Sequence, residues 1–406
     1  MTQNALEPIV NAIFNYGRWF LSCWIEPKFN FKDFFKVVGL KNKEEQYPKL
    51  IKSYTGDLGT VYLLNVPTGL NMGHFESIKD SLEIQIKKSI DIRLRSGFIE
   101  IETIEKELSS NIPYKLSKRT VDPGIKIPIG ENIKGEQVIL DLNNDPMTYI
   151  VGTTGSGKSV CTKVLLTSLI TTYKSSELEI FLGDLKRVEL SLFANVQHCK
   201  KFVYTVEDVT DLIADLLAET NERYDLFMQN EVTNIFEYNK LKGVKKLKYQ
   251  VLYLEEIVML LEDKNKRAMK ILKQLIAISR AAGLYCFYTT QRPDNTVIDN
   301  VVKANTNNRI CFKTEDTKNS IVALDREGAE KLRGKGHGLI KRGANTEEFQ
   351  AYFISDTQVK EAIKPYLNKP QNKAIAESNS VQNKRLFDKD IEQPMEENII
   401  DLSFLD

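Results

Sequence analysis

The stretch Gly152-Thr153-Thr154-Gly155-Ser156-Gly157-Lys158-Ser159 fits the pattern G-x-x-x-x-G-K-[ST] of a phosphate-binding loop. Its glycines allow the backbone to curl, so that successive N–H groups face a single anion. We expect Lys158 to be a solvent-facing charge that reaches the β- and γ-phosphates of a nucleotide, and Ser159 to offer its hydroxyl group to Mg²⁺. The stretch therefore predicts a site for ATP and Mg²⁺.

The residues on either side of this loop have the character that such a loop requires. Residues 147–151 are typical of a buried strand, and residues 160–166 continue as a helix that begins with Val160. The N-terminus of that helix would direct its dipole at the phosphates. Strand, loop and helix in this order favour a nucleotide site over a chance glycine-rich turn.

The composition limits the class of protein more than its partners. The chain has 406 residues, enough for two domains and a further segment, and 42% of them are hydrophobic, which supports a globular core. Lys and Arg number 56 against 55 Asp and Glu, so any DNA-binding surface must be local. Five cysteines form no C-x-x-C pair and three histidines are scattered, which favours a reduced, cytoplasmic chain without structural metal.

The sequence shows no segment suited to span a membrane. The best candidate, residues 9–25, is short and is interrupted by Asn11, Asn15 and Arg18. Its aromatic side chains suit either an interfacial helix or, as the simpler interpretation, a helix packed on its own domain.

Residues 1–120 have the pattern of a separate small α/β module, which we interpret as an assembly or docking domain. Residues 59–66, 90–94 and 98–101 are typical of strands, and residues 71–88 carry apolar side chains at helical spacing. This module contains no catalytic constellation that the sequence reveals.

Residues 121–367 alternate strands with helices, which predicts a parallel sheet covered on both faces. Ligands of such sheets bind at the carboxyl ends of the strands. The expected strands are residues 137–141, 147–151, 178–182, 250–254, 284–290 and 308–313, and the expected long helices begin at the capping box of Thr205 and at residue 266. The phosphate loop, Glu255-Glu256 and Gln291 each follow the end of one of these strands.

Two further segments are defined by their charge. Residues 240–248 form a basic run, which is either a solvated loop or a DNA contact. Residues 368–406 are polar and acidic and predict a disordered tail. The last apolar cluster of this tail suits either docking on a partner or a fraying end.

Residues 127–340 resemble the motor domain of the FtsK/SpoIIIE family of DNA translocases. The motifs that carry the resemblance occur in family order: Ile129-Gly130-Glu131-Asn132-Ile133-Lys134-Gly135-Glu136, Asp141-Leu142, the phosphate loop, Asp184-Leu185-Lys186-Arg187-Val188-Glu189-Leu190, Glu222-Arg223-Tyr224-Asp225-Leu226-Phe227, Arg280-Ala281-Ala282-Gly283, Thr290-Gln291-Arg292-Pro293, Lys303-Ala304-Asn305 and residues 328–336. The resemblance implies a RecA-like P-loop ATPase that assembles as a ring, usually a hexamer, around DNA.

The resemblance also implies roles for single residues. Lys158 and Ser159 match the residues that bind phosphate and Mg²⁺, and Glu256 matches the acidic residue that polarises the attacking water. Gln291 matches the sensor glutamine near the γ-phosphate. The sequence departs from the family at Glu255, where an aspartate is usual and which would support the Mg²⁺ shell through a longer arm, and at Leu185, where a proline is usual.

The chain also differs from cell-division members of the family. It lacks their membrane segments and leaves no room for their C-terminal DNA-reading domain, so it looks like the coupling ATPases of conjugative elements in Gram-positive bacteria. That analogy implies DNA as a partner, with a relaxase or membrane-bound transfer proteins that could recruit the chain to the membrane. A secretion ATPase that moves protein, and a slowly hydrolysing nucleotide-gated adaptor, are the alternative interpretations.

Ring motors normally complete each site with an arginine from the neighbouring subunit, because the developing phosphate charge needs a second cation. Arg280 is our first candidate for this catalytic role and Arg309 is the second. Either arginine could instead pair with a carboxylate inside its own subunit.

Overall fold

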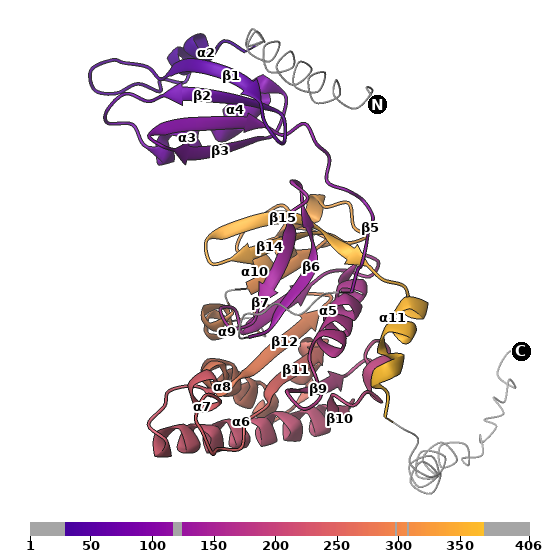
Figure 1. Ribbon diagram of the computed structural model, residues 1–406. Helices are drawn as coiled ribbons and strands as arrows, with labels where there is room; N and C mark the ends of the chain where they lie inside the picture. The colour runs from indigo at the N-terminus through magenta and orange to yellow at the C-terminus, as the bar shows by residue number, and fades with distance from the viewer. Residues whose placement is uncertain (1–28, 117–123, 297–298, 307, 369–406) are drawn as a thin grey trace, which may run out of the picture.

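The computed structural model describes residues 29–116, 124–296, 299–306 and 308–368. These residues form two sheets, one of four strands and one of eleven. Figure 1 shows the sheets in two separate bodies that a single stretch of chain connects. The aromatic segment 9–25 and the acidic tail lie outside the described residues, and no described helix has the length and apolarity needed to cross a membrane.

The smaller body is an antiparallel sheet in the order β1-β2-β4-β3. Its elements are α2 (Phe31–Val37), β1 (Lys49–Thr55), β2 (Thr60–Asn65), α3 (Met72–Ser77), α4 (Lys79–Ile86), β3 (Ile90–Arg95) and β4 (Phe98–Thr103). The core gathers Phe35, Leu64, Phe75 and Leu82, none of which is exposed. The helical spacing noted over residues 71–88 corresponds to two helices, because Ile78 leaves the helical conformation at ψ 4° and separates α3 from α4.

The larger sheet is parallel in one half and antiparallel in the other. Its strands are β5 (Ile112–Pro113), β6 (Lys126–Asn132), β7 (Gln137–Asp141), β8 (Met147–Val151), β9 (Leu178–Asp184), β10 (Cys199–Val203), β11 (Tyr249–Glu255), β12 (Leu284–Thr290), β13 (Asn308–Phe312), β14 (His337–Arg342) and β15 (Asn345–Phe353). The order β10-β9-β11-β12-β8-β13 is parallel throughout, and β14-β15-β6-β7 extend it with antiparallel pairs. The predicted α/β class with parallel strands is confirmed, and the antiparallel half was not predicted.

Helices cover both faces of the parallel half (Figure 1). The main ones are α5 (Lys158–Thr172) and α11 (Asp356–Ile363) on one face and α6 (Val206–Gln229) and α8 (Arg267–Ala282) on the other. The shorter ones are α7 (Ile235–Tyr238), α9 (Asn300–Asn305), α10 (Thr317–Leu324), η1 (Ser191–Phe193), η2 (Ile257–Glu262), η3 (Ala329–Lys331) and η4 (Lys364–Tyr366). Alternate residues of β11 pack on opposite faces: Tyr253 lies in the core under α5, and Leu252 and Leu254 lie in the core under α6 and α8.

The capping residue predicted for α6 is confirmed. The hydroxyl group of Thr205 accepts a hydrogen bond from the backbone N–H of Asp208 at 3.1 Å. The same hydroxyl donates to the Asp208 carboxylate at 2.6 Å. The acidic side chain near the first turn also suits the positive end of the helix dipole.

One buried arginine of α6 fixes this helix against the sheet. Arg223 donates to the carbonyl oxygens of Lys248 at 2.9 Å and Ala282 at 2.8 Å, and its side chain is only 4% exposed. It also pairs with Glu219 at 2.8 Å. The Lys248 carbonyl immediately precedes β11, and the Ala282 carbonyl lies at the end of α8. The guanidinium group of Arg223 therefore connects α6 with β11 and α8.

We predict that Arg223→Met lowers the free energy of unfolding by about 2–4 kcal/mol, because buried carbonyl groups lose their donors. Chemical denaturation of the purified variant measures this change. The control is Arg267→Met on α8, whose ion pair with Asp211 spans 3.7 Å between side chains 61% and 58% exposed. Such a surface pair contributes less than about 1 kcal/mol. Equal effects of the two substitutions would contradict the structural role of Arg223.

Candidate functional site

The phosphate loop joins β8 to α5, as predicted, and the neighbouring chain sets its shape. Thr153 donates its backbone N–H to the carbonyl oxygen of Lys313 at 3.0 Å, and Gly336 donates to that of Ser156 at 2.7 Å. Gly157 has φ +115°, and a Cβ atom there would lie 2.3 Å from the backbone nitrogen of Gly336. Only glycine therefore fits at this position, both for conformation and for space.

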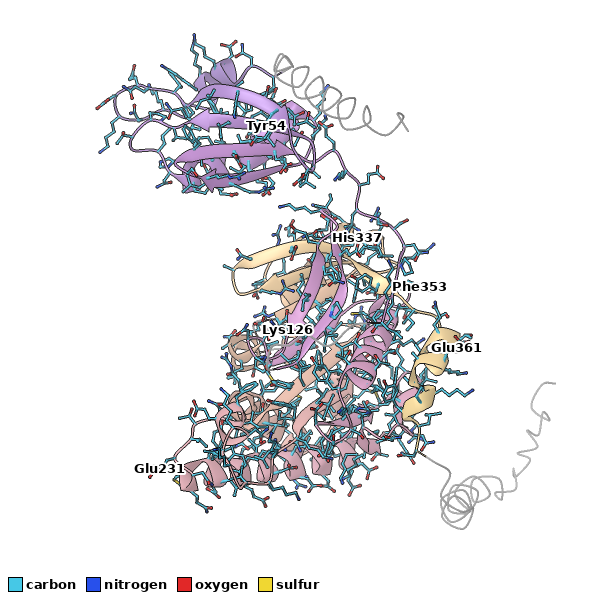
Figure 2. All side chains as sticks on the ribbon, in the orientation of Figure 1. Tyr54, Lys126, Glu231, His337, Phe353 and Glu361 are labelled. Atoms are coloured by element: carbon cyan, nitrogen blue, oxygen red, sulfur yellow. The ribbon has the colours of Figure 1, made fainter. Side chains whose placement is uncertain are left out.

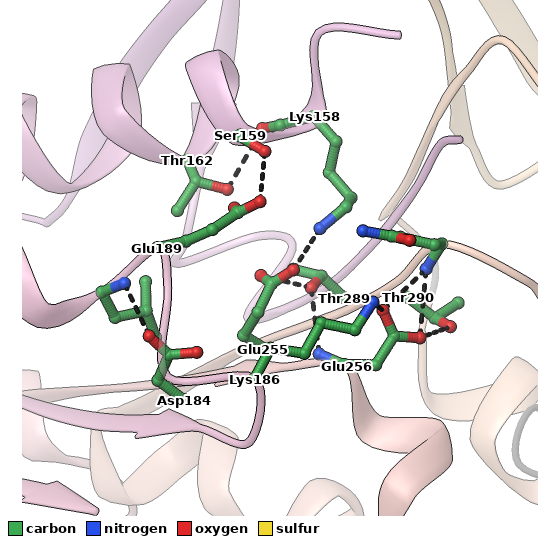
Figure 3. A network of polar contacts seen from close by, with 12 residues as sticks. Lys158, Ser159, Thr162, Asp184, Lys186, Glu189, Glu255, Glu256, Thr289 and Thr290 are labelled. Carbon is green, nitrogen blue, oxygen red and sulfur yellow. Dashed lines mark hydrogen bonds and ion pairs between the residues drawn. The ribbon is translucent and has the colours of Figure 1, made fainter. Parts of the chain in front are cut away.

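Lys158 is buried rather than solvent-facing, so that expectation was wrong. Its side chain is 3% exposed, and its ammonium group forms an ion pair with the carboxylate of Glu255 (Figure 3). Glu255 ends β11 and also accepts a hydrogen bond from the Thr289 hydroxyl at 2.6 Å. Burial raises the pKa of Glu255, and the neighbouring Lys158 charge opposes that rise. The ion pair ties the first turn of α5 to the end of a central strand.

Glu256 follows in the left-handed region, with φ 57° and ψ 58°. Its carboxylate accepts hydrogen bonds from the Thr290 hydroxyl at 2.6 Å and from the Gln291 backbone at 3.2 Å. Lys186 pairs with the same carboxylate at 2.6 Å (Figure 3). Burial disfavours the charged form of Glu256, but these donors outweigh burial and the pKa lies below its usual value.

Glu189, for which the sequence alone predicted no role, lies beside the phosphate loop. The Ser159 hydroxyl donates to one carboxylate oxygen of Glu189 (Figure 3). The other oxygen, Oε2, is buried and has no hydrogen-bond partner among the described residues. Asp184 holds the connecting loop by accepting the backbone N–H of Leu190 at 2.9 Å. The signal for Glu189 and Lys186 was present in the motif of residues 184–190, whose charged side chains lie next to a strand end.

Some of these groups border one cavity of about 610 Å³. Residues 153–155 and 157–160 of the phosphate loop line it together with Glu189, Gln291 and parts of β15. Lys158, Ser159 and Gln291 therefore meet at one space, whereas Glu255 and Glu256 lie behind them. A cavity of about 960 Å³ on the smaller body is bordered by none of these groups.

The two candidate arginines have different surroundings. Arg309 is 7% exposed and pairs with Asp325 of its own subunit at 2.6 Å, so it is already engaged there. Arg280 is exposed in the last turn of α8, at the end of the sheet opposite the phosphate loop. Asp145 immediately precedes β8, and burial raises the pKa of its carboxyl group. The charges of Arg342 and Arg280 oppose that rise, so Arg280 lies near the start of β8. Arg280 therefore cannot serve the site of its own subunit.

A strand, a phosphate loop and a helix, with an acidic pair at the end of β11, a parallel strand separated from β8 by β12, define the P-loop ATPase fold. Residues 115–278 match the model of the FtsK/SpoIIIE family. The chain therefore contains an FtsK/SpoIIIE family domain.

Curated relatives agree with this assignment. The chain is 30% identical to the DNA translocase SpoIIIE of Bacillus subtilis over 351 residues, which cover 81% of this chain and 44% of the relative. It is also 30% identical to the DNA translocase FtsK of Halalkalibacterium halodurans, covering 77% of this chain and 42% of the relative. The chain thus spans less than half the length of these relatives.

Solved structures share the fold at lower identity. The conjugation coupling protein TcpA of pCW3, determined with ATPγS, has a TM-score of 0.58 and 23% identity, covering 82% of this chain and 98% of that chain. The Type VII secretion ATPase EccC of Thermomonospora curvata has a TM-score of 0.55 and 18% identity, covering 65% of this chain and 33% of that chain.

We predict that Lys158→Ala weakens ATP binding by about 10–100-fold, because a charge-assisted contact contributes about 1.5–3 kcal/mol. The variant should also lose about 3 kcal/mol of stability, since Glu255 stays buried without its cation. Titration calorimetry and denaturation measure the two effects. Lys163→Ala is the control on the same helix, where the lysine pairs with the largely exposed Asp356 at 2.5 Å. Unchanged ATP affinity in Lys158→Ala would remove this loop from the nucleotide site.

Proposed function

We propose that the chain is an ATP-driven DNA translocase that acts as a ring, usually a hexamer, in the DNA transfer of a mobile genetic element. The observation that carries the proposal is the position of Glu256. Its carboxylate accepts hydrogen bonds from Thr290, which ends β12, the strand that pairs with β8, and from the backbone of Gln291, which itself borders the cavity. The N-terminal sheet is proposed to serve assembly or docking, with a relaxase or membrane-bound transfer proteins as partners.

The proposed chemistry is nucleophilic attack of water on the γ-phosphate of ATP. Residues Gly152, Thr153, Thr154, Gly155, Ser156, Gly157 and Val160 enclose the phosphates with Lys158 and Ser159. Lys158 has to exchange Glu255 for the phosphates, since one ammonium group now faces that carboxylate. Glu256 orients the water and accepts its proton, and Lys186 and Thr290 fix the position of the carboxylate.

The residues present suit Mg²⁺. The Ser159 hydroxyl and the carboxylates of Glu255 and Glu189 are oxygen donors, the type that Mg²⁺ prefers, and Oε2 of Glu189 is buried without a partner among the described residues. No set of three His, Cys, Asp or Glu side chains in the described residues could hold a metal alone, which fits an ion held largely by nucleotide oxygens. When bound, Mg²⁺ neutralises charge on the β- and γ-phosphates.

DNA is favoured as the substrate because the two relatives at 30% identity are named DNA translocases. Conjugation is favoured because the match with the TcpA structure covers 98% of that chain and 82% of this chain. The fold alone also accommodates the secretion ATPase alternative, since EccC has a similar TM-score. Glu255 keeps the slow-adaptor alternative in consideration, because the carboxylate is engaged by both Lys158 and Thr289.

The test is ATP hydrolysis measured with and without DNA at increasing salt. We predict DNA stimulation that is insensitive to sequence and that fades between about 50 and 200 mM salt, because phosphate contacts release counterions. Glu256→Gln is the matched control and should bind ATP without turning it over. Stimulation by a secreted protein alone would support the secretion ATPase. Hydrolysis that ignores both additions would support the adaptor.

Arg280 is proposed to reach the site of a neighbouring subunit. We predict that Arg280→Ala alone hydrolyses ATP poorly, and that mixing it with inactive Lys158→Ala subunits restores part of the activity, because some sites then contain both groups. Arg267→Ala, on the same helix, is the control and should need no rescue. If the two variants co-assemble in a pull-down and activity stays absent, Arg280 does not act in trans.

A further inference from the structure

The cavity beside the phosphate loop extends past the phosphate-binding groups. Beyond the loop it is bordered by Ser110 and Asn111, which lie between β4 and β5 in the chain, and by residues 350–353 of β15. None of these residues can contribute to phosphoryl transfer through a charge. Apart from Lys335, the lining outside the phosphate loop and Glu189 is therefore uncharged.

This uncharged part of the lining has the character of a base-binding slot. Nucleotide pockets combine apolar surface with a few polar groups that fix orientation. Phe353 is 48% exposed, so its ring offers an accessible face, and Figure 2 labels it beside the chain that descends from the smaller body. Tyr352 is 5% exposed, and its hydroxyl is engaged with Gln137 and Glu131. Gln350 is also engaged, since its amide donates to the Lys335 carbonyl at 2.8 Å. Phe353 and Asn111 are thus the side chains best suited to a base.

The segment that carries Asn111 is fixed to the ATPase body. β5 pairs with Tyr352 and Phe353 of β15, and Tyr114 donates its backbone N–H to the Phe353 carbonyl at 2.9 Å. The Tyr114 hydroxyl lies 2.7 Å from that of Ser168 on α5. Arg333 donates to the Leu108 carbonyl at 3.0 Å. Contacts on both sides of Ser110 and Asn111 hold these two residues at the cavity.

We propose that Asn111 and Phe353 form the base-binding subsite and select adenine among nucleoside triphosphates. The Phe353 ring stacks on the base, and the Asn111 amide, which has one donor and one acceptor group, pairs with the donor and acceptor on one edge of adenine. This inference rests on the proposed function, since it assigns the other end of the same ATP site. It also makes the bound nucleotide touch the segment that leads to the N-terminal sheet.

The test compares the affinities of ATP, GTP and inorganic tripolyphosphate by titration calorimetry on the full chain. Tripolyphosphate contains the phosphates without the base, so base contacts cannot affect it. Phe353→Ala should weaken ATP about ten-fold or more, in line with the loss of one stacking contact, and leave tripolyphosphate unchanged. Asn111→Ala should reduce the preference for ATP over GTP.

Matched variants keep the test independent of folding. Phe353→Tyr retains the ring and should restore ATP affinity. Leu116→Ala removes an exposed apolar side chain from the same connecting segment, outside the cavity, and should change nothing. Parallel losses of ATP and tripolyphosphate, or unchanged ATP affinity in both variants, would overturn the subsite. If the unmodified chain binds tripolyphosphate as tightly as ATP, the base adds no affinity; this result would contradict the base-binding subsite but not the phosphate-binding loop. If the chain binds neither compound, the proposed function fails and the subsite with it.

Discussion

The carboxyl ends of three neighbouring parallel strands meet at one edge, and the site depends on this register. Glu255 of β11 lies opposite Asp184 of β9, and β12 ends beside them with Thr289 and Thr290. Buried charges at such an edge are costly unless each finds a partner. The ion pair of Lys158 with Glu255 meets this requirement and also attaches α5 to the middle of the sheet. Fold and site are therefore stabilised by the same contact.

At Glu256, hydrogen bonds and an ion pair hold a strained backbone conformation. A left-handed conformation at a non-glycine residue costs about 1–3 kcal/mol and persists only where the surroundings impose it. At Glu256 the surroundings are Lys186, Thr290 and Gln291, each from a loop or strand end next to the phosphate loop. The strained backbone turns the carboxylate back over the strand ends instead of continuing β11. A change at the γ-phosphate that moves Gln291 would be transmitted directly to Glu256.

The sequence pattern correctly predicted those elements whose conformation depends on residues close together in the chain. Residues 147–166 form the expected strand, loop and helix because buried strands and glycine turns leave a clear pattern in short windows. The antiparallel half of the sheet contains two local hairpins, β6 with β7 and β14 with β15. Their joining was missed because it pairs Gly130 with Ala351, and such distant pairing leaves no short-range signal. The burial of Lys158 was missed for the same reason, since its partner Glu255 is 97 residues away. Glu189 and Lys186 were visible as a family motif, but their roles depend on where the loop after β9 folds.

The stretch of chain between the two bodies is held against the ATPase body. The N-terminal sheet has its own core and is joined to the ATPase body through one stretch of chain. That stretch does not pass freely between them: β5 adds to β15, and Tyr114 reaches α5, the helix that begins at Lys158. Any shift of α5 or β15 that accompanies nucleotide exchange must therefore move residues 108–114. Ser110 and Asn111 of this segment also border the cavity, so a nucleotide bound there would lie against the stretch that leads to the N-terminal sheet.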